Sequence, residues 1–279
     1  MIRLALRVHR ADAELVLAEL LELAPSGVEE RELPGDVVEY AVYGAPGELP
    51  ALPDLQAVAG NALVEITTEE IADDWHERWK AFHRPVAIPA VRPGGPGLRV
   101  RPPWEPPLDD GMEDLVIDPG RAFGTGAHDT TRLCLELLLG IEPGGPVADI
   151  GCGSGVLGIA AARLGFGPVF GLDHEQESVD ATRQNAAVNG VEMDSLRFDL
   201  LLDGTAPAAP TVLANLVRPL LLAVARTGFR DGLVPETLIA SGLLAHEADE
   251  IADAFSTAMG LREARRVHGG EWAALLLVR

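Results

Sequence analysis

Apolar and polar positions alternate in short runs along the first part of the chain. Apolar side chains at every second position predict a half-buried strand over residues 2–8, and similar runs predict strands over 37–43 and 63–67. Apolar residues three and four positions apart over 17–24 predict an amphipathic helix. This order of elements is typical of a ferredoxin-like α/β module, so we expect a small N-terminal domain at 1–66.

A polar segment with many prolines and glycines follows this module. Residues 69–82 are predicted to form a helix on which Trp75 and Trp79 lie one turn apart, as packing anchors between domains rather than a ligand box. The run PGGPG at 93–97 breaks regular structure. We therefore assign residues 67–97 to a linker helix and a Pro/Gly-rich linker.

Longer alternating helices and strands predict a doubly wound α/β domain over residues 98–279. Helices are expected at 130–139, 156–164, 176–189, 218–227 and 247–259, and strands at 147–150, 169–172, 211–214 and 237–240. The apolar segments 261–267 and 272–278, joined by a Gly-Gly turn, predict a hairpin that adds antiparallel edge strands to a parallel sheet.

The amino-acid composition says more about the binding partners of the protein than about the reaction that it carries out. The chain has 279 residues, of which 47% are hydrophobic and 5% aromatic, and its net charge is −21. Such a surface repels phosphates and offers few stacking partners for bases, so we expect no direct binding to nucleic acid. The acidity either steers a basic protein toward the chain or only keeps it soluble.

Targeting and metal signals are lacking in the sequence. The first residues are too charged for a signal peptide, and no apolar run has bilayer-spanning length, so we expect a soluble cytoplasmic protein. Cys134 and Cys152 indicate no disulfide framework, and the histidines lack ligand spacing. We expect no metal site and no membrane contact.

The segment Asp149–Gly155 (DIGCGSG) follows an apolar run and precedes an alanine-rich helical pattern. This order predicts a strand, a tight turn at Gly151, Gly153 and Gly155, and a helix N-terminus whose N–H groups favour an anionic group. Asp173 ends the next predicted strand, where a carboxylate can accept both hydroxyls of a ribose. We infer a site for a nucleoside-bearing cofactor.

More than one cofactor fits these glycines. Gly153–Gly158 satisfies the G-x-G-x-x-G pattern of dinucleotide-binding folds, with Asp173 at a suitable distance. S-adenosyl-L-methionine is favoured by Asp149, an acid two residues before Gly151, by a second Gly/Thr-rich loop at Phe123–Thr131, and by the antiparallel hairpin. A purely structural glycine turn is the third alternative.

The motifs FGTGAHDTT at Phe123–Thr131 and ANL at Ala214–Leu216 resemble the signature of the PrmA family, whose members trimethylate large-subunit ribosomal protein eleven. The resemblance covers roughly residues 70–279 and includes Pro119–Ala122, Asp149–Gly155, Asn185–Val191, Ser241–Leu244 and Glu271-Trp272. It implies an N-terminal domain that recognises the substrate, a flexible linker, and a class I methyltransferase domain with a Rossmann-like doubly wound sheet.

The resemblance also implies residue roles. The expected cofactor residues are Thr131, Gly151, Asp173 and Asn215, together with Gly153 and Gly155 of the turn and Phe123 and Thr130 of the upstream loop. The glycine turn is expected to hold the methionine end of the cofactor, and Asp173 the ribose. Where such families often read Asp-x-Asp-Pro after the second strand, this chain reads DHEQ.

Asn215 is the residue that we predict to be catalytic. Its amide oxygen is expected to accept a hydrogen bond from the incoming amine, with turn capping as the alternative. Thr131 is expected to donate its hydroxyl proton to the methionine carboxylate, with helix N-capping as the alternative. Deprotonating a lysine at pH 7 costs about 4.6 kcal/mol. Since His128 is a weak candidate and no other base is obvious, we expect no dedicated general base.

The sequence thus predicts an S-adenosyl-L-methionine-dependent N-methyltransferase that modifies lysine side chains or the N-terminal amine of a basic ribosomal protein, and that acts as a monomer. Three alternatives stay open. They are an NAD-dependent oxidoreductase, a non-catalytic binding module, and a methyltransferase for another protein or a small molecule.

Overall fold

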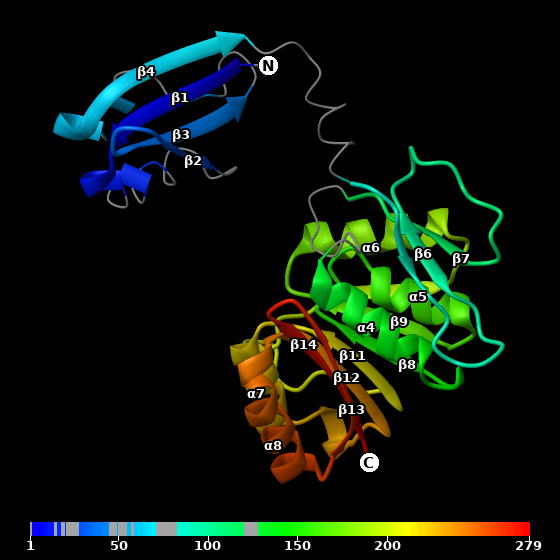
Figure 1. The fold of residues 1–279 in the computed structure, drawn as a ribbon. Coiled ribbons are helices and arrows are strands. Elements are labelled where there is room, and N and C mark those ends of the chain that lie inside the picture. Colours follow the sequence, from blue (N-terminus) through cyan, green and yellow to red (C-terminus); the bar gives the residue numbers. More distant parts are fainter. Residues whose placement is uncertain are drawn as a thin grey trace. The chain divides into compact units, whose positions relative to one another are not determined.

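The computed structural model divides the chain into two compact units, residues 1–82 and 83–279. It describes residues 2–13, 16–17, 20, 28–44, 49, 55–56, 59–70, 83–119 and 128–279. The four-stranded sheet lies in the first unit, and the seven-stranded and three-stranded sheets lie in the second (Figure 1). The domain boundaries expected at 66 and 97 stay a prediction.

The first unit is built on a four-stranded antiparallel sheet with the strand order β2-β3-β1-β4. The elements are β1 (Ile2–His9), the 3-10 turn η1 (Arg10–Asp12), β2 (Glu29–Leu33), β3 (Val37–Gly44), the 3-10 turn η2 (Gly60–Ala62) and β4 (Leu63–Glu70). Leu6, Leu20, Tyr40 and Leu55 form its buried core. The sequence did not predict β2, because its residues EEREL form a charged edge strand without apolar alternation.

Two predicted helices fall largely outside the described residues. Of the helix expected over 17–24, the structure describes two positions, both helical. The helix expected over 69–82 is wrong at its start, because its first two residues belong to β4 and pair with β1. Trp75 and Trp79 lie outside the described residues, so their packing role stays a prediction.

The second unit is a mixed α/β structure around a seven-stranded sheet with the order β10-β9-β8-β11-β12-β14-β13. The five strands from β10 to β12 are parallel, and β14 runs antiparallel to both of its neighbours. The strands are β8 (Val147–Ile150), β9 (Val169–Asp173), β10 (Met193–Arg197), β11 (Thr211–Asn215), β12 (Thr237–Leu244), β13 (Arg262–Gly269) and β14 (Trp272–Val278). The helices are α4 (Asp129–Leu139), α5 (Val156–Leu164), α6 (Gln176–Val188), α7 (Arg218–Thr227) and α8 (Ala248–Met259), with 3-10 turns η3 (Arg230–Gly232) and η4 (Ala245–Glu247).

Helices cover both faces of this sheet, as the doubly wound pattern predicted (Figure 1). The helices α4, α5 and α6 lie on one face and α7 and α8 on the other, each layer with its own buried apolar cluster. The antiparallel hairpin is confirmed, with β14 inserted between β12 and the edge strand β13. The side chains of Ala273, Leu275 and Leu277 are therefore fully buried.

The sequence missed a small three-stranded sheet that precedes α4. It consists of β5 (Val86–Ile88), β6 (Leu98–Arg101) and β7 (Glu113–Val116), in the order β5-β6-β7. Strands of three or four residues are too short for a periodic signal, and β5 falls within the predicted linker. The sheet contacts α4 and α5, and Arg163 of α5 forms an ion pair with Glu113.

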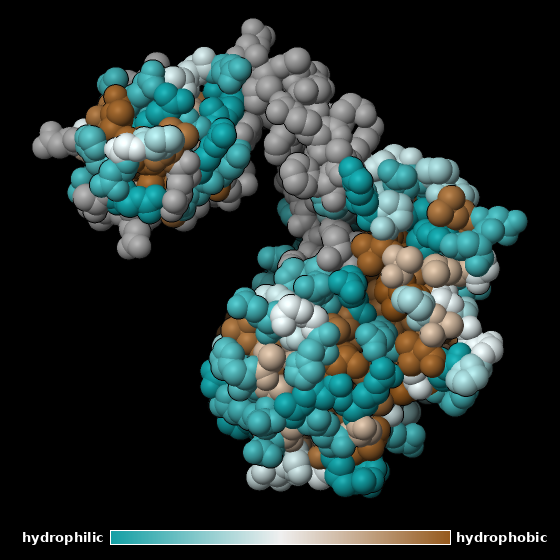
Figure 2. Space-filling model, in the orientation of Figure 1, coloured by the Kyte–Doolittle hydropathy of each residue, from teal (hydrophilic) through white to brown (hydrophobic). Residues whose placement is uncertain are grey.

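Hydrophilic residues cover most of the surface drawn in Figure 2, and hydrophobic residues gather in patches on the second unit. Within the described part of the chain, none of the helices has the length and apolar character needed to cross a membrane.

Candidate functional site

The predicted glycine turn connects β8 to α5 and has a backbone conformation that only glycine adopts readily. All four residues of β8 are buried, and Gly151 follows with φ = +74°. A Cβ atom on Gly151 would lie 2.3 Å from Cδ2 of Leu216, so the turn also needs glycine for space. Gly155 is left-handed as well and is the N-cap of α5, whose first turn therefore begins directly at the turn.

Asp173 ends β9 and binds the glycine turn directly. Its Oδ2 accepts a hydrogen bond from the N–H of Gly153 (2.9 Å), and its Oδ1 accepts one from the N–H of Glu175 (3.0 Å). The side chain is 9% exposed. A carboxylate offers about four lone-pair positions, so these two bonds leave acceptor capacity on Asp173 for a ligand.

Asp149 is a second buried acid beside the turn. Its Oδ2 accepts a hydrogen bond from the N–H of Gly158 (2.9 Å), and its Oδ1 has no partner among the described residues. Burial raises the pKa of Asp149 to about 7, and the negative charge of Asp173 adds to this rise. This carboxyl group therefore takes up a proton near neutral pH in the folded protein.

Asn215 and Thr131 lie 84 positions apart in the sequence and meet in the structure. Asn215 ends β11, and its Nδ2 donates a hydrogen bond to Oγ1 of Thr131 on the first turn of α4 (3.3 Å). Thr131 is fully buried. The amide oxygen of Asn215 is buried and has no partner among the described residues, so it does not cap a turn there.

His128, rather than Thr131, is the N-cap of α4, so the capping alternative for Thr131 is wrong. The Nδ1 of His128 lies 2.8 Å from Oγ1 of Thr130 and also accepts from the Thr130 N–H. The His128 ring packs edge-on against Trp272 of β14, with ring centroids 5.0 Å apart. Thr130 is thus engaged with the helix cap, and its role as a cofactor residue stays a prediction. Phe123 lies outside the described residues.

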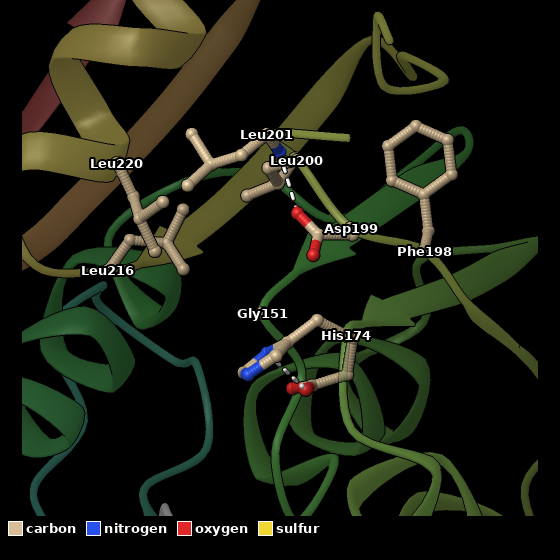
Figure 3. Close-up of a pocket in the computed structure, with 9 residues that line it drawn as sticks. Gly151, His174, Phe198, Asp199, Leu200, Leu201, Leu216 and Leu220 are labelled. Atoms are coloured by element: carbon tan, nitrogen blue, oxygen red, sulfur yellow. Dashed lines mark hydrogen bonds and ion pairs between the residues drawn. The ribbon is translucent and has the colours of Figure 1, made fainter. Parts of the chain in front are cut away.

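A cavity of about 180 Å³ opens at the carboxyl ends of the parallel strands (Figure 3). Gly151 and Asp173 line it, together with His174, Phe198, Asp199, Leu200, Leu201, Leu216 and Leu220. In Figure 3 the leucines and Phe198 border the cavity, while Gly151 and His174 lie at its lower side. The sequence did not predict the contribution of residues 198–201, which follow β10 and form a loop closed by a hydrogen bond from the Leu201 N–H to Asp199 Oδ1 (2.8 Å).

The predicted site residues thus form two connected groups. Gly151 and Gly153 belong to the turn, to which Asp173 bonds, and Gly151 and Asp173 also line the cavity. Thr131 and Asn215 form a pair at the end of β11. Leu216, which directly follows Asn215, lines the cavity and joins the two groups. Among the described residues, no group of three or more His, Cys, Asp and Glu side chains has an arrangement that could hold a metal ion.

The parallel sheet, the glycine turn after β8, the acid at the end of β9 and the inserted antiparallel strand define a class I methyltransferase fold. A family model described as ribosomal protein L11 methyltransferase (PrmA) matches residues 49–279. The chain belongs to this family and is a methyltransferase.

Individual relatives agree with the family. The chain is 39% identical over 245 residues to a ribosomal protein L11 methyltransferase of Parasynechococcus marenigrum, covering 83% of this chain and 81% of the relative. It is 39% identical over 215 residues to one of Pseudomonas paraeruginosa, covering 75% and 70%. A crystal structure of ribosomal protein L11 methylase from Lactobacillus delbrueckii is similar with a TM-score of 0.57 and 29% identity, covering 69% of this chain and 98% of that one.

Proposed function

We propose that this protein transfers methyl groups from S-adenosyl-L-methionine to amines of a ribosomal protein of the L11 type, on lysine side chains, the N-terminal amine or both. Family membership supports the reaction, and the relatives carry this substrate in their names. The observation that carries the proposal is the amide of Asn215, whose nitrogen is held by Thr131 while its oxygen is buried without a partner among the described residues. A buried acceptor in this state is costly until a donor meets it, and an amine nucleophile brings such a donor.

The residues at the turn fit the cofactor that the family implies. Gly151 lets the backbone pass within reach of a ligand, Asp173 keeps lone pairs for ribose hydroxyls, and the apolar walls at Phe198 and Leu216 suit a flat adenine base. We therefore assign the methionine end to the turn, the ribose to Asp173 and the adenine to the cavity. Bound there, S-adenosyl-L-methionine supplies an electrophilic methyl group on a sulfonium.

Asn215 would orient the amine for an in-line attack on that methyl group. Its oxygen accepts an N–H of the neutral amine, which turns the nitrogen lone pair toward the methyl carbon. Thr131 accepts from Asn215 and keeps its own hydroxyl proton, which we assign to the methionine carboxylate. We propose no dedicated base, since His128 Nδ1 is engaged by Thr130, and the proton released by the amine passes to water. A pH–rate profile that follows one histidine and is abolished by His128→Ala, with the fold intact, would contradict this.

We assign recognition of the protein substrate to the N-terminal domain at residues 1–66, followed by the linker at 67–97 and the catalytic domain at 98–279. The antiparallel strand order β2-β3-β1-β4 supports a ferredoxin-like architecture for this domain. The net charge of −21 favours a basic partner over a nucleic acid. A cytoplasmic monomer is consistent with this role.

The test is methylation of ribosomal proteins from the same organism by the purified protein and labelled S-adenosyl-L-methionine, with the products identified by mass spectrometry. We expect methyl groups on one basic ribosomal protein of the L11 type. Asn215→Ala and Asp173→Ala should abolish or strongly reduce the signal. Asp194→Ala, which changes an exposed acid on the neighbouring strand β10, is the matched control and should retain it.

Other outcomes separate the alternatives. Cofactor binding without methylation of any ribosomal protein would refute the proposed substrate and direct attention to another protein or a small molecule. Failure of the wild-type protein to bind the cofactor, together with binding of NAD, would refute the proposed function altogether.

A further inference from the structure

A stripe of buried polar side chains runs along the face of α6 toward the glycine turn. It consists of Thr182 and Asn185 of α6 and of Asn189, the C-cap residue directly after the helix. These three residues are spaced three and four positions apart and are 0%, 3% and 7% exposed. Burying a polar side chain to this extent costs free energy of folding unless the side chain is hydrogen-bonded. Each of the three bonds to the backbone of a segment outside α6, so the stripe connects the helix to other parts of the unit.

Two members of this stripe hold successive carbonyl groups of the glycine turn. Oγ1 of Thr182 donates to the carbonyl of Gly153 (2.9 Å), and Nδ2 of Asn185 donates to the carbonyl of Ser154 (2.9 Å). The C=O and N–H of one trans peptide point in opposite directions. Fixing the Gly153 carbonyl toward α6 therefore turns the Ser154 N–H away from α6.

Asn185 also reaches a second segment. Its Oδ1 accepts the N–H of Asp118 (3.0 Å), just beyond β7. In the sequence, Asp118 comes shortly before the FGTGAHDTT motif. One amide thus joins the glycine turn to the segment that leads into the other motif of the site, and both of its polar atoms are used.

Asn189 also connects two segments by hydrogen bonds, but these bonds do not involve the glycine turn. Its Oδ1 accepts the N–H of Val116 (2.9 Å), and its Nδ2 donates to the carbonyls of Val116 (2.7 Å) and Asn185 (2.8 Å). Its side-chain hydrogen bonds therefore fix the end of β7 to the C-terminal end of α6, and they go to Val116 and Asn185 rather than to the glycine turn. This difference makes Asn189 a control for the general effect of changing a buried polar side chain at this helix.

We propose that Asn185 is a positioning residue for cofactor binding, which holds the glycine turn and the segment at Asp118 in one fixed relation. This inference rests on the proposed function, because the ligand of the turn is taken to be S-adenosyl-L-methionine. The requirement is specific to an amide. An aspartate keeps the acceptor for Asp118 but replaces the donor to Ser154 with an oxygen that repels the carbonyl.

The test compares Asn185→Asp, Thr182→Val and Asn189→Asp with the wild type. Hydrogen exchange is measured without ligand, and the Kd of S-adenosyl-L-homocysteine is measured by calorimetry. We expect Asn185→Asp to accelerate exchange over residues 151–158 and to raise the Kd about tenfold, the effect of losing one buried hydrogen bond. Thr182→Val, which keeps the side-chain shape, should change both readouts in the same direction.

Asn189→Asp introduces the same chemical change one turn along the helix. It should accelerate exchange near residues 113–118 and leave both the turn and the Kd close to wild type. Equal effects of Asn185→Asp and Asn189→Asp, or wild-type exchange and affinity in Asn185→Asp, would overturn the inference. If Asn185→Asp does not fold, Asn185→Ala decides through the same two readouts, because it also removes the donor to the Ser154 carbonyl.

The exchange measurement keeps this inference separate from the proposed function. A wild-type protein that does not bind S-adenosyl-L-homocysteine would overturn the proposed function and the role of Asn185 in binding that ligand. The exchange pattern would still show whether Asn185 holds the turn.

Discussion

The buried carboxyl group of Asp149 predicts a pH dependence of stability that one substitution should remove. In the folded protein its pKa is raised from the ordinary value of 3.8 to about 7, chiefly by burial, so that the folded state holds a proton that the unfolded state releases above pH 4. Stability must then fall as the pH rises from about 4 to about 7, and it should level off above that range.

The magnitude follows from proton linkage. One additional proton on the folded state changes the free energy of unfolding by about 1.4 kcal/mol per pH unit. Between pH 5 and pH 8 the difference in protonation persists for roughly two pH units, which gives a loss of about 3 kcal/mol. Asp149→Asn keeps an acceptor for the Gly158 N–H and cannot ionise, so the variant should lack this contribution.

The assay is urea unfolding of the wild type and Asp149→Asn at pH 5, 6, 7 and 8, with the free energy of unfolding extrapolated to water. Other titrating groups affect both proteins equally, so the difference between the two isolates Asp149. That difference should shift by about 3 kcal/mol in favour of the variant between pH 5 and pH 8. A difference that stays constant over this range would refute the reasoning, as would a shift of opposite sign.

Three further predictions follow from particular contacts. Gly242→Ala should lower the free energy of unfolding, measured by chemical denaturation, by at least about 2 kcal/mol, because Gly242 has φ = +82° and a Cβ atom there would lie 2.4 Å from the carbonyl oxygen of Leu216. Unchanged stability would contradict this. Thr131→Val removes the acceptor for the Asn215 amide and should reduce turnover about tenfold in a methylation assay, with a small loss of stability. Wild-type turnover of this variant would argue against a role of the Thr131–Asn215 hydrogen bond in catalysis. Both cysteines are buried, and burial raises the pKa of Cys152, so the native protein should react with an aromatic disulfide reagent at pH 8 only on unfolding; rapid labelling of the folded protein would contradict this.

Local patterns identified the elements with strong apolar signals. The strands β8, β9 and β11 are buried apolar runs, and the glycine turn with Asp173 could be read from spacing alone. The strands β2 and β10 were missed because they lie at sheet edges and most of their side chains are charged or polar. Edge strands are specified by their neighbours more than by their own periodicity.

The site was harder to predict wherever it depends on contacts between distant segments. The pairing of Thr131 with Asn215 requires knowledge of how α4 packs against the sheet, which no local pattern contains. The stripe at Thr182, Asn185 and Asn189 has the three- and four-residue spacing of a helix face. Since polar faces usually meet solvent, the pattern gave no reason to expect a buried one.

Leu216 sits between two glycines, and this arrangement constrains which substitutions the protein can accumulate together. A Cβ on Gly151 would overlap the end of the Leu216 side chain, whereas a Cβ on Gly242 would overlap the Leu216 backbone. A smaller residue at position 216 would relieve the first overlap and leave the second unchanged. Substitutions at positions 151 and 216 should therefore have non-additive effects, although the positive φ of Gly151 still disfavours any side chain there, while no side chain at 216 can compensate for the loss of glycine at 242.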